Sequence, residues 1–269
     1  MPDPVPQELE AALQSSAARR GRLGAEIHYL TETGSTNDVA AALADSGSPE
    51  GTLVVASSQT AGRGRLGRRW HSPPDAGLYV SLIVRSASAA PYLTLAGGVA
   101  VAQGITRATG LPVQIKWPND IMVPDSARPS RPRKLAGILA EASSGAEGLI
   151  YVILGFGINL RTTAYPPELR DRATSIEAEL GRHVDAGSVL AETLAALSSC
   201  LSSLEKGMAL RVLEDWRMLS PSSRSGGVEF GTPSGRVEGI ALGIDDTGAL
   251  LVRVGGRVER VIAGEVVWK

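Results

Sequence analysis

The pattern of hydrophobic and polar positions predicts alternating helices and strands through most of the chain. Apolar residues spaced three and four apart predict helices, and short apolar or alternating runs bounded by turn residues predict strands. The predicted strands are residues 25–33, 51–59, 77–84, 112–117, 133–143 and 148–160. The predicted helices are residues 7–20, the segment after Ser35 that ends at Gly47, residues 91–110 and residues 189–208. A sheet covered by helices would bury the apolar side of all these elements.

The pattern changes after Pro221. The tail consists of short apolar runs broken by glycines and by Asp246-Thr247-Gly248, which predicts a small β-barrel or meander. The predicted fold is therefore α+β, with a helix-covered sheet followed by a small β domain. Its expected divisions are an N-terminal helical segment (1–25), a central domain (26–220) and a C-terminal domain (221–269).

Composition and charge narrow the class of protein without identifying it. The 269 residues carry a net charge of −1, whereas a protein that binds nucleic acid over a broad face usually has a basic excess. One cysteine, Cys200, cannot form an internal disulfide, and the three histidines lack metal-ligand spacing. The N-terminus lacks the order of a signal peptide, and the apolar run at 148–160 is too short to span a bilayer. We therefore expect a cytoplasmic protein that does not cross a membrane.

The segment 59–70, QTAGRGRLGRRW, combines the G-x-G-x-x-G spacing of dinucleotide-binding loops with four arginines. A Rossmann loop needs a helix directly after its glycines, whereas Pro73, Pro74 and a predicted strand follow here. Glycines let backbone N–H groups approach an anion, and arginines can donate bidentate hydrogen bonds to phosphates or carboxylates. We expect a loop that holds a small anion. An exposed basic turn and a nucleic-acid patch are the alternatives.

Five short motifs, taken in order, point to one family. They are residues 35–37 (STN), 62–68 (GRGRLGR), 116–120 (KWPND), 134–139 (KLAGIL) and 155–159 (GFGIN). With these motifs the chain closely resembles biotin protein ligases, and its tail is similar to the SH3-like C-terminal domain of that family. The resemblance implies a class II synthetase-like catalytic domain with a mixed central β-sheet at 26–220. It also implies an SH3-like β-barrel at 221–269.

The resemblance implies a two-step, ATP-dependent reaction. Biotin and MgATP would give biotinyl-5′-AMP and pyrophosphate. A lysine of a biotin carboxyl carrier domain, from an acetyl- or acyl-CoA carboxylase or a pyruvate carboxylase, would then take the biotin. The first step brings a carboxylate against a triphosphate, so clustered cations and Mg²⁺ are needed to offset their repulsion. Mg²⁺ is expected with ATP, and no residue is assigned as its ligand.

The resemblance also implies which residues form the site. Lys134 would bridge the biotin carboxylate and the α-phosphate, Arg65 would hold the adenylate, and Asp120 would orient or deprotonate the acceptor lysine. The implied biotin-binding residues are Ser35, Thr36, Asn37, Gln59, Gly62, Arg63, Gly64, Arg65, Lys134 and Gly137. The implied ATP- and adenylate-binding residues are Arg65, Arg68, Trp70, Asn119, Lys134 and Asn159.

Several of these residues also have purely structural interpretations. Ser35 or Thr36 would serve as a helix cap, Pro-Asn-Asp at 118–120 as a turn, Trp70 as core packing and Lys134 as a surface lysine.

The chain departs from the family pattern in places. Leu66 stands where many relatives have another arginine, and the loop at 123–133 is longer and more basic than usual. Too few residues precede the central domain for a winged helix-turn-helix, so we expect a monofunctional enzyme without DNA binding. A homodimer through edge strands is compatible with the sequence. The alternative functions are a lipoate–protein ligase and a non-enzymatic protein that uses the arginine loop as an anion site.

Overall fold

The computed structural model describes residues 2–124, 132–161, 165–232 and 235–269. The helices are α1 (Gln7–Ser15), α2 (Ala17–Arg20), α3 (Thr36–Asp45), α4 (Leu93–Thr109), α5 (Ile176–Leu180), α6 (Ala186–Glu205) and α7 (Ala209–Leu219). The strands of a larger sheet are β1 (Ile27–Thr33), β2 (Leu53–Gln59), β3 (Gly77–Val84), β4 (Gln114–Lys116), β5 (Asp120–Val123), β6 (Arg133–Gly145) and β7 (Gly148–Asn159). Those of a smaller sheet are β8 (Gly227–Thr232), β9 (Gly235–Ile244), β10 (Leu250–Val254), β11 (Arg257–Val261) and β12 (Val266–Trp268).

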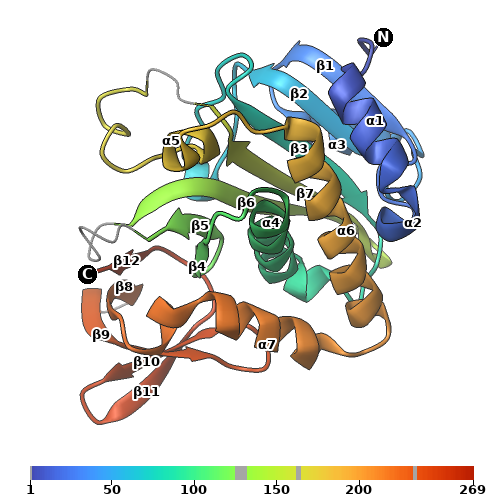
Figure 1. Cartoon of the computed structure of the whole chain (residues 1–269). Coiled ribbons are helices and arrows are strands. Elements are labelled where there is room, and N and C mark those ends of the chain that lie inside the picture. The colour runs from blue at the N-terminus through green and yellow to red at the C-terminus, as the bar shows by residue number, and fades with distance from the viewer. Residues whose placement is uncertain (1, 125–131, 162–164, 233–234) are drawn as a thin grey trace.

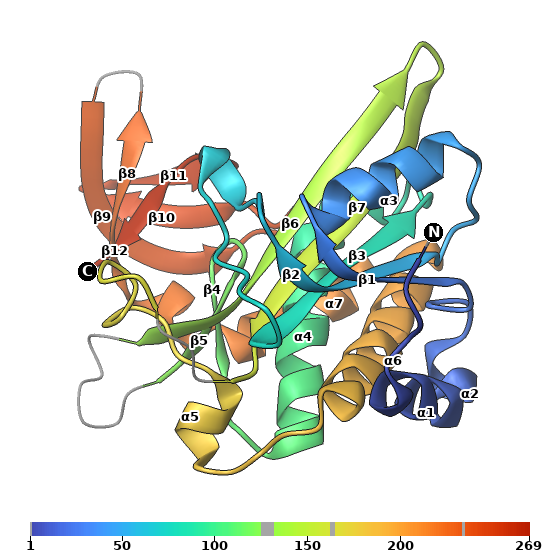
Figure 2. The ribbon, with the colours of Figure 1, turned by 90° about the horizontal axis from the view of Figure 1, so that it is seen from above.

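The larger sheet is mixed and has helices on both sides. Its strand order is β1-β2-β3-β7-β6-β5-β4; β1 and β2 run parallel, and the other neighbours are antiparallel. Helices α1, α2, α4 and α6 gather on one side of the sheet and α3 lies on the other, while the β6–β7 hairpin projects past the neighbouring strands (Figures 1 and 2). The mixed, helix-covered central sheet expected from the sequence is confirmed.

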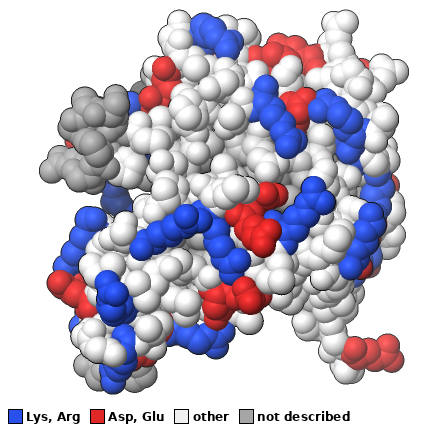
Figure 3. Space-filling view, turned by 60° about the horizontal axis from the view of Figure 1, so that its bottom comes forward, with Lys and Arg blue, Asp and Glu red and all other residues white. Residues whose placement is uncertain are grey.

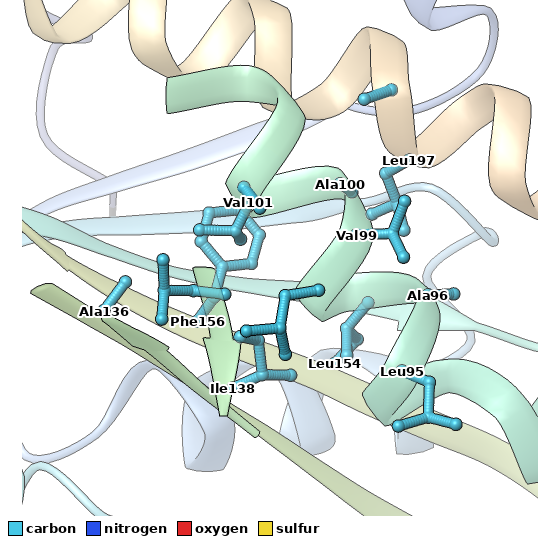
Figure 4. Packing of buried hydrophobic residues seen from close by; sticks show 14 of the residues in the cluster. Leu95, Ala96, Val99, Ala100, Val101, Ala136, Ile138, Leu154, Phe156 and Leu197 are labelled. Carbon is cyan, nitrogen blue, oxygen red and sulfur yellow. The ribbon is translucent and has the colours of Figure 1, made fainter. Parts of the chain in front are cut away.

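The helix-covered face contains the main hydrophobic core. Side chains from alternate positions of the strands, including Ile138, Leu154 and Phe156, pack against α4 (Figure 4). A Cβ on Gly97 of α4 would lie only 3.1 Å from Ile138 and 3.2 Å from Leu154, so glycine there lets the helix lie close to the sheet. Complete burial of these side chains stabilises the sheet through the hydrophobic effect.

Helix α6 packs behind α4 and completes this core. Among the described residues, α6 is the one helix long and apolar enough to cross a membrane by length and composition alone. However, 72% of its apolar window is buried inside the protein, and it contacts α4, α1 and α2. Its apolar residues therefore have protein neighbours, as the sequence predicts for a core-facing helix. Met208, included in that prediction, lies beyond the end of α6 and is exposed.

The opposite face of the sheet is apolar at one end and open in the middle. Along β7, Tyr151 and Ile153 pack under α3 in a second, smaller hydrophobic cluster. The next residues with the same orientation are Gly155 and Gly157, which have no side chain to fill the space above the sheet. The candidate site lies over these glycines.

The C-terminal strands form one antiparallel sheet in the order β11-β10-β9-β8-β12. Among the described residues no pairing joins β11 to β12, so the expected SH3-like barrel is not closed. A cleft of about 510 Å³ lies between strand β11 and the described ends of β8 and β9. The sheet is fastened to the larger one: the indole N–H of Trp117 donates to the carbonyl of Gly248 (3.1 Å), and the Ser220 hydroxyl donates to the carbonyl of Ile115 (2.6 Å).

Every helix and strand predicted by residue range is present, and three further elements of the central domain were not predicted. The six predicted strands correspond to β1, β2, β3, β4, β6 and β7, and the expected small β domain is the C-terminal sheet. The elements not predicted are β5, α5 and α7. Most of the basic loop at 123–133 lies outside the described residues.

Candidate functional site

The arginine-rich loop connects β2 to β3 and folds back on itself. The backbone N–H of Gly64 donates to the carbonyl of Arg68 (2.7 Å), and the N–H of Trp70 donates to the carbonyl of Gly62 (2.9 Å). One 3₁₀ turn at Arg65–Gly67 lies at the tip, and residues 60–76, all of them described, contain no α-helix. The prediction that this is not a Rossmann loop is confirmed.

Trp70 lies in a slot made by two glycines on neighbouring strands. Gly137 and Gly157 are directly paired across β6 and β7. A Cβ on Gly157 would come within 2.4 Å of the Trp70 Nε1, and a Cβ on Gly137 within 3.0 Å of the Trp70 ring. Among the described residues, the buried Nε1 has no hydrogen-bond partner. The indole therefore forms a wall of the site, outside the two hydrophobic clusters, and the core-packing interpretation of Trp70 is wrong.

Lys134 and Asp120 form an ion pair beside this slot. The Lys134 Nζ lies 2.6 Å from the Asp120 Oδ1 and 5.1 Å from the centre of the Trp70 ring. Asp120 is the first residue of β5 and is directly opposite Gly137, so both lie on the same face of the sheet. Lys134 is thus a half-buried, paired cation rather than a free surface lysine.

Asn119 and Arg65 extend the site toward the loop. Asn119 lies in the turn expected at 118–120, where its side-chain Nδ2 donates to the carbonyl of Ile138 (2.8 Å). Its Oδ1 is 3.4 Å from an Nη1 of Arg65, a long hydrogen bond. Burial lowers the pKa of Arg65, and the nearby cation Arg68 lowers it further, whereas Asp120 opposes this shift. Arg65 is therefore a half-buried guanidinium without a close carboxylate partner among the described residues.

Thr36, Gln59 and Asn37 belong to a buried polar network. The Gln59 Oε1 accepts from the backbone N–H (2.9 Å) and the hydroxyl of Thr36 (3.2 Å), and its Nε2 donates to the Ser72 hydroxyl (2.9 Å). Ser81, on β3, lies within donating distance of the Thr36 hydroxyl and the Asn37 Oδ1. These bonds hold the amide of Gln59 in one orientation.

The glycines and the helix start nearby also fit a ligand site. A Cβ on Gly155 would lie 2.3 Å from the Asn37 Oδ1, and one on Gly62 would lie 2.7 Å from the Trp70 carbonyl oxygen. Ser35 occupies the N-cap position of α3, but its side chain makes no capping hydrogen bond. The helix-cap interpretation of the Ser35 hydroxyl is therefore wrong.

Arg63 is held between two carboxylates, Asp38 of α3 and Glu141 of β6 (2.8 Å to Glu141). The hydrogen bonds that Arg63 donates to Glu141 and then to Asp38 raise the pKa of Arg63, the one to Glu141 having the larger effect. A cavity of about 390 Å³ adjoins this cluster. Its walls are Arg63, Gly64, Arg65, Leu66, Gly67, Thr94, Leu139, Ala140 and Glu141. Small-molecule sites commonly have volumes of about 300–1,000 Å³.

Arg68 and Asn159 tie the site to its surroundings. Arg68 forms an ion pair with Glu265, just before β12, and so joins the loop to the smaller sheet. Asn159 ends β7, and its amide donates to the carbonyl of Thr174 (2.9 Å), whose N–H donates to the carbonyl of Lys134 (2.9 Å). On the face in Figure 3, basic and acidic side chains are interspersed and form no single basic field.

Several polar residues lie at the site without having been predicted as site residues. They are Asp38, Ser72, Ser81, Lys116, Glu141 and Glu265. Alternation along the strand from 112 to 117 is a local signal for Lys116, because its neighbours Ile115 and Trp117 are buried on the other face. Glu141 and Glu265 reach the loop only through the tertiary fold, for which the sequence offers no local signal.

The arginine loop, the glycine slot and the lysine–aspartate pair lie together on one face of the mixed sheet, within residues 59–157. Residues 30–159 match the Biotin/lipoate A/B protein ligase family, and residues 227–268 match the Biotin protein ligase C terminal domain. The chain is 33% identical over 277 residues to the biotin–[acetyl-CoA-carboxylase] ligase of Mycobacterium tuberculosis, covering 96% of this chain and 94% of that protein. The chain belongs to the biotin protein ligase family and is a ligase.

Two further similarities agree with this membership. The bifunctional ligase/repressor BirA of Bacillus subtilis is 35% identical over 252 residues, covering 91% of this chain and 74% of BirA. The biotin protein ligase from Aquifex aeolicus, solved in complex with biotin and ATP, superposes with a TM-score of 0.77 at 27% identity. That superposition covers 91% of this chain and 99% of the other.

Proposed function

We propose that this ligase activates biotin with ATP and transfers it to a lysine of a biotin carboxyl carrier domain. The observation that carries the proposal is the Lys134–Asp120 pair beside the Trp70 slot, with Arg65 and Arg68 on the loop nearby. The pair supplies a cation for the reacting carboxylate and phosphate and a carboxylate for the acceptor amine. The similarity to a biotin–[acetyl-CoA-carboxylase] ligase supports the carrier domain of an acetyl- or acyl-CoA carboxylase as partner. The carrier domain of a pyruvate carboxylase is proposed as an alternative acceptor.

In the first step, a carboxylate oxygen of biotin attacks the α-phosphorus of ATP. The new carbon–oxygen–phosphorus anhydride is biotinyl-5′-AMP, and pyrophosphate leaves with the electron pair of the broken bond. Lys134 faces both reacting groups and lowers their repulsion, while Arg63, Arg65 and Arg68 supply further positive charge. Lys134 and Arg65 are half-buried, which strengthens their interactions because less water screens them.

The ureido group of biotin would be recognised by the polar network on the other side of Trp70. It has one carbonyl and two N–H groups, all of which need partners in a closed pocket. Ser35, Thr36 and Gln59 offer hydroxyl and amide groups that are buried or half-buried. Because Gln59 is already fixed by Thr36 and Ser72, its orientation would be set before biotin binds.

In the second step, the acceptor lysine attacks the acyl carbon of the adenylate, and AMP leaves. Asp120 would orient this amine and take its proton, which requires Asp120 to loosen its contact with Lys134. The adenylate would stay under the loop through Arg65, Arg68, Trp70, Asn119 and Asn159. Retention of the adenylate matters because a released acyl phosphate would acylate amines indiscriminately.

Mg²⁺ would enter the site bound to ATP. Among the described residues no group of three or more histidine, cysteine, aspartate or glutamate side chains converges to hold a metal ion. Asp120 is a carboxylate within the site, and Mg²⁺ commonly binds through one or two carboxylates plus substrate phosphates. This arrangement fits a metal carried by the nucleotide.

We also propose the same division of the chain as the sequence predicts: an N-terminal helical segment at 1–25, a catalytic domain at 26–220 and a C-terminal domain at 221–269.

The test combines the two half-reactions. The wild-type protein should release pyrophosphate from ATP when biotin is present and then label a purified carrier domain. Lys134→Ala should reduce both activities about 10²-fold or more, by analogy with removal of a single group that stabilises transition-state charge. Lys206→Ala, at an exposed lysine on the C-terminal end of α6, should match wild type. Lipoate replaces biotin in a parallel assay; labelling with lipoate instead of biotin, or full activity of Lys134→Ala, would contradict the proposal.

A further inference from the structure

Lys116 is a half-buried cation that the proposed reaction does not yet use. It ends β4 and is directly opposite Asp120 of β5, and Asp120 is directly opposite Gly137 of β6. Gly137 in turn pairs with Gly157 of β7. Directly paired residues point to the same face of a sheet. Lys116, Asp120 and the Trp70 slot therefore form one row across the site face.

The ammonium group of Lys116 has no partner within the part of the chain that the structure describes. No hydrogen bond or ion pair joins it to another described residue, and Asp120 Oδ1 is already 2.6 Å from the Lys134 Nζ. Its neighbours in the sequence, Ile115 and Trp117, are buried in the hydrophobic core, so the position is rigidly held. A partly buried charge without a partner is costly unless a ligand supplies one.

The charges around Lys116 are mostly positive. Burial lowers the pKa of Lys116, and the nearby cations Lys134, Arg172 and Arg68 lower it further, whereas Asp120 opposes this shift. Arg172 is exposed, and its side chain has no partner among the described residues. Lys116 thus has three cations and one carboxylate, Asp120, near enough to change its pKa, and among the described residues Asp120 is paired with Lys134 and Arg68 with Glu265. Such an excess matches a ligand with several negative charges.

We propose that Lys116 binds the β- and γ-phosphates of ATP and holds the pyrophosphate as it leaves. This inference rests on the proposed function. The carboxylate oxygen of biotin forms the bond to the α-phosphorus while the bond to the bridging oxygen breaks, and both electrons of that bond go to pyrophosphate. In-line displacement places the attacking and leaving groups on opposite sides of the phosphorus.

The row across the sheet gives this displacement a direction. The biotin carboxylate would approach from the Trp70 slot over β6 and β7, and Lys134 and Asp120 mark the reacting centre. Neighbouring strands are about 5 Å apart, so β4 places Lys116 roughly 10 Å from Gly137, on the side away from the slot. The charge that develops on pyrophosphate therefore arises near the unpartnered ammonium of Lys116.

The decisive variants are Lys116→Met, which keeps much of the chain length, and Lys116→Arg, which keeps the charge. Lys206→Met is the matched control at an exposed lysine. Calorimetric titration of the nucleotide-free protein with inorganic pyrophosphate should show at least tenfold weaker binding for Lys116→Met. Lys116→Arg should recover part of that affinity. Biotin-dependent release of pyrophosphate from ATP should fall about 10- to 100-fold in Lys116→Met.

A second measurement separates a leaving-group role from a structural one. Transfer from purified biotinyl-5′-AMP to the carrier domain bypasses the first step and should stay within about twofold of wild type in Lys116→Met. A parallel loss in this reaction would overturn the inference, because it would mean that Lys116 holds Asp120 or the acceptor. Unchanged pyrophosphate affinity in Lys116→Met would also overturn it. If wild type makes no biotinyl-5′-AMP, the proposed function fails, and the pyrophosphate titration still decides whether Lys116 binds this anion.

Discussion

The two faces of the central sheet are built from neighbouring residues of the same strands, yet they differ in almost every physical respect. On the helix side, Ile115 and Ile138 are fully buried among apolar neighbours of α4. On the loop side, the adjacent positions hold Lys116 and Gly137, beside an indole whose N–H has no partner among the described residues. One face is complete without a ligand, and the other has open space and unpartnered polar groups. The difference indicates that stability and chemistry are separated by the two-residue period of a strand.

This separation gives the same backbone two independent roles. The packed face fixes the strands rigidly because its close-packed side chains resist displacement. The rigid strands then hold Lys116, Asp120 and Gly137 in one row without any need for these residues to contribute much to folding. Lys116, a charged residue without a partner among the described residues, is tolerated because its neighbours on the other face supply the stability.

The largest effect should come from a change on the packed face. Ile115→Ala should lower the free energy of unfolding by about 2–5 kcal/mol, because it removes buried methyl groups and leaves a cavity beside α4. Its sequence neighbour provides the contrast: Lys116→Met should change that free energy by less than about 1 kcal/mol. Urea unfolding followed by circular dichroism measures both. Equal losses for the two variants would show that the faces are not energetically separate.

Much of this arrangement follows from local sequence pattern, and the remainder depends on long-range contacts. The alternation in residues 77–84 predicts β3 with the observed bounds, since both of its faces are buried by neighbours that any sheet would provide. Strand β5 is only four residues long and exists through its pairing with β4 and β6, so nothing local distinguishes it from the turn before it.

The site shows the same division between local and long-range information. The motifs locate Lys134 and Asp120, the family resemblance adds Trp70, and the structure brings the three together at the glycine slot. Glu141 and Glu265 carry no recognisable motif, and they meet Arg63 and Arg68 only after distant parts of the chain have packed. The charge balance of the loop therefore could not be predicted from the sequence.

A smaller loss of stability is expected from a change at Gly157, where the absence of a side chain leaves room for Trp70. Gly157→Ala would place a Cβ within 2.4 Å of the Trp70 Nε1, so the indole must leave its slot. We expect a loss of about 1–3 kcal/mol in the free energy of unfolding from overpacking. Because the wall of the site moves, biotin-dependent pyrophosphate release should fall about tenfold. Both quantities are measured on the purified variant.

A double-mutant cycle assigns this effect to the slot. In a Trp70→Ala background, Gly157→Ala should cost much less stability, because the clashing ring is gone. Gly34→Ala serves as the control glycine, since a Cβ there would meet nothing within 4 Å and its φ is not in the left-handed region. If Gly157→Ala is equally destabilising with and without the indole, the slot is not what requires glycine at 157.

The smallest effect should come from the charges that restrain the loop. Glu141→Gln removes one of the two carboxylates that hold Arg63 and leaves Asp38 in place. The pair is partly exposed, so its loss should change the free energy of unfolding by less than about 1 kcal/mol. Arg63 then loses only the Asp38 ion pair when it turns toward a ligand carboxylate. Biotin affinity measured by calorimetry should therefore rise, by at most about fivefold. The gain should shrink at about 0.5 M salt, because ions already weaken the attraction between Glu141 and Arg63 in the wild type. A fall in affinity instead would mean that Glu141 aligns Arg63 for biotin rather than competing for it, and the charged side of the sheet would then be organised before the ligand arrives.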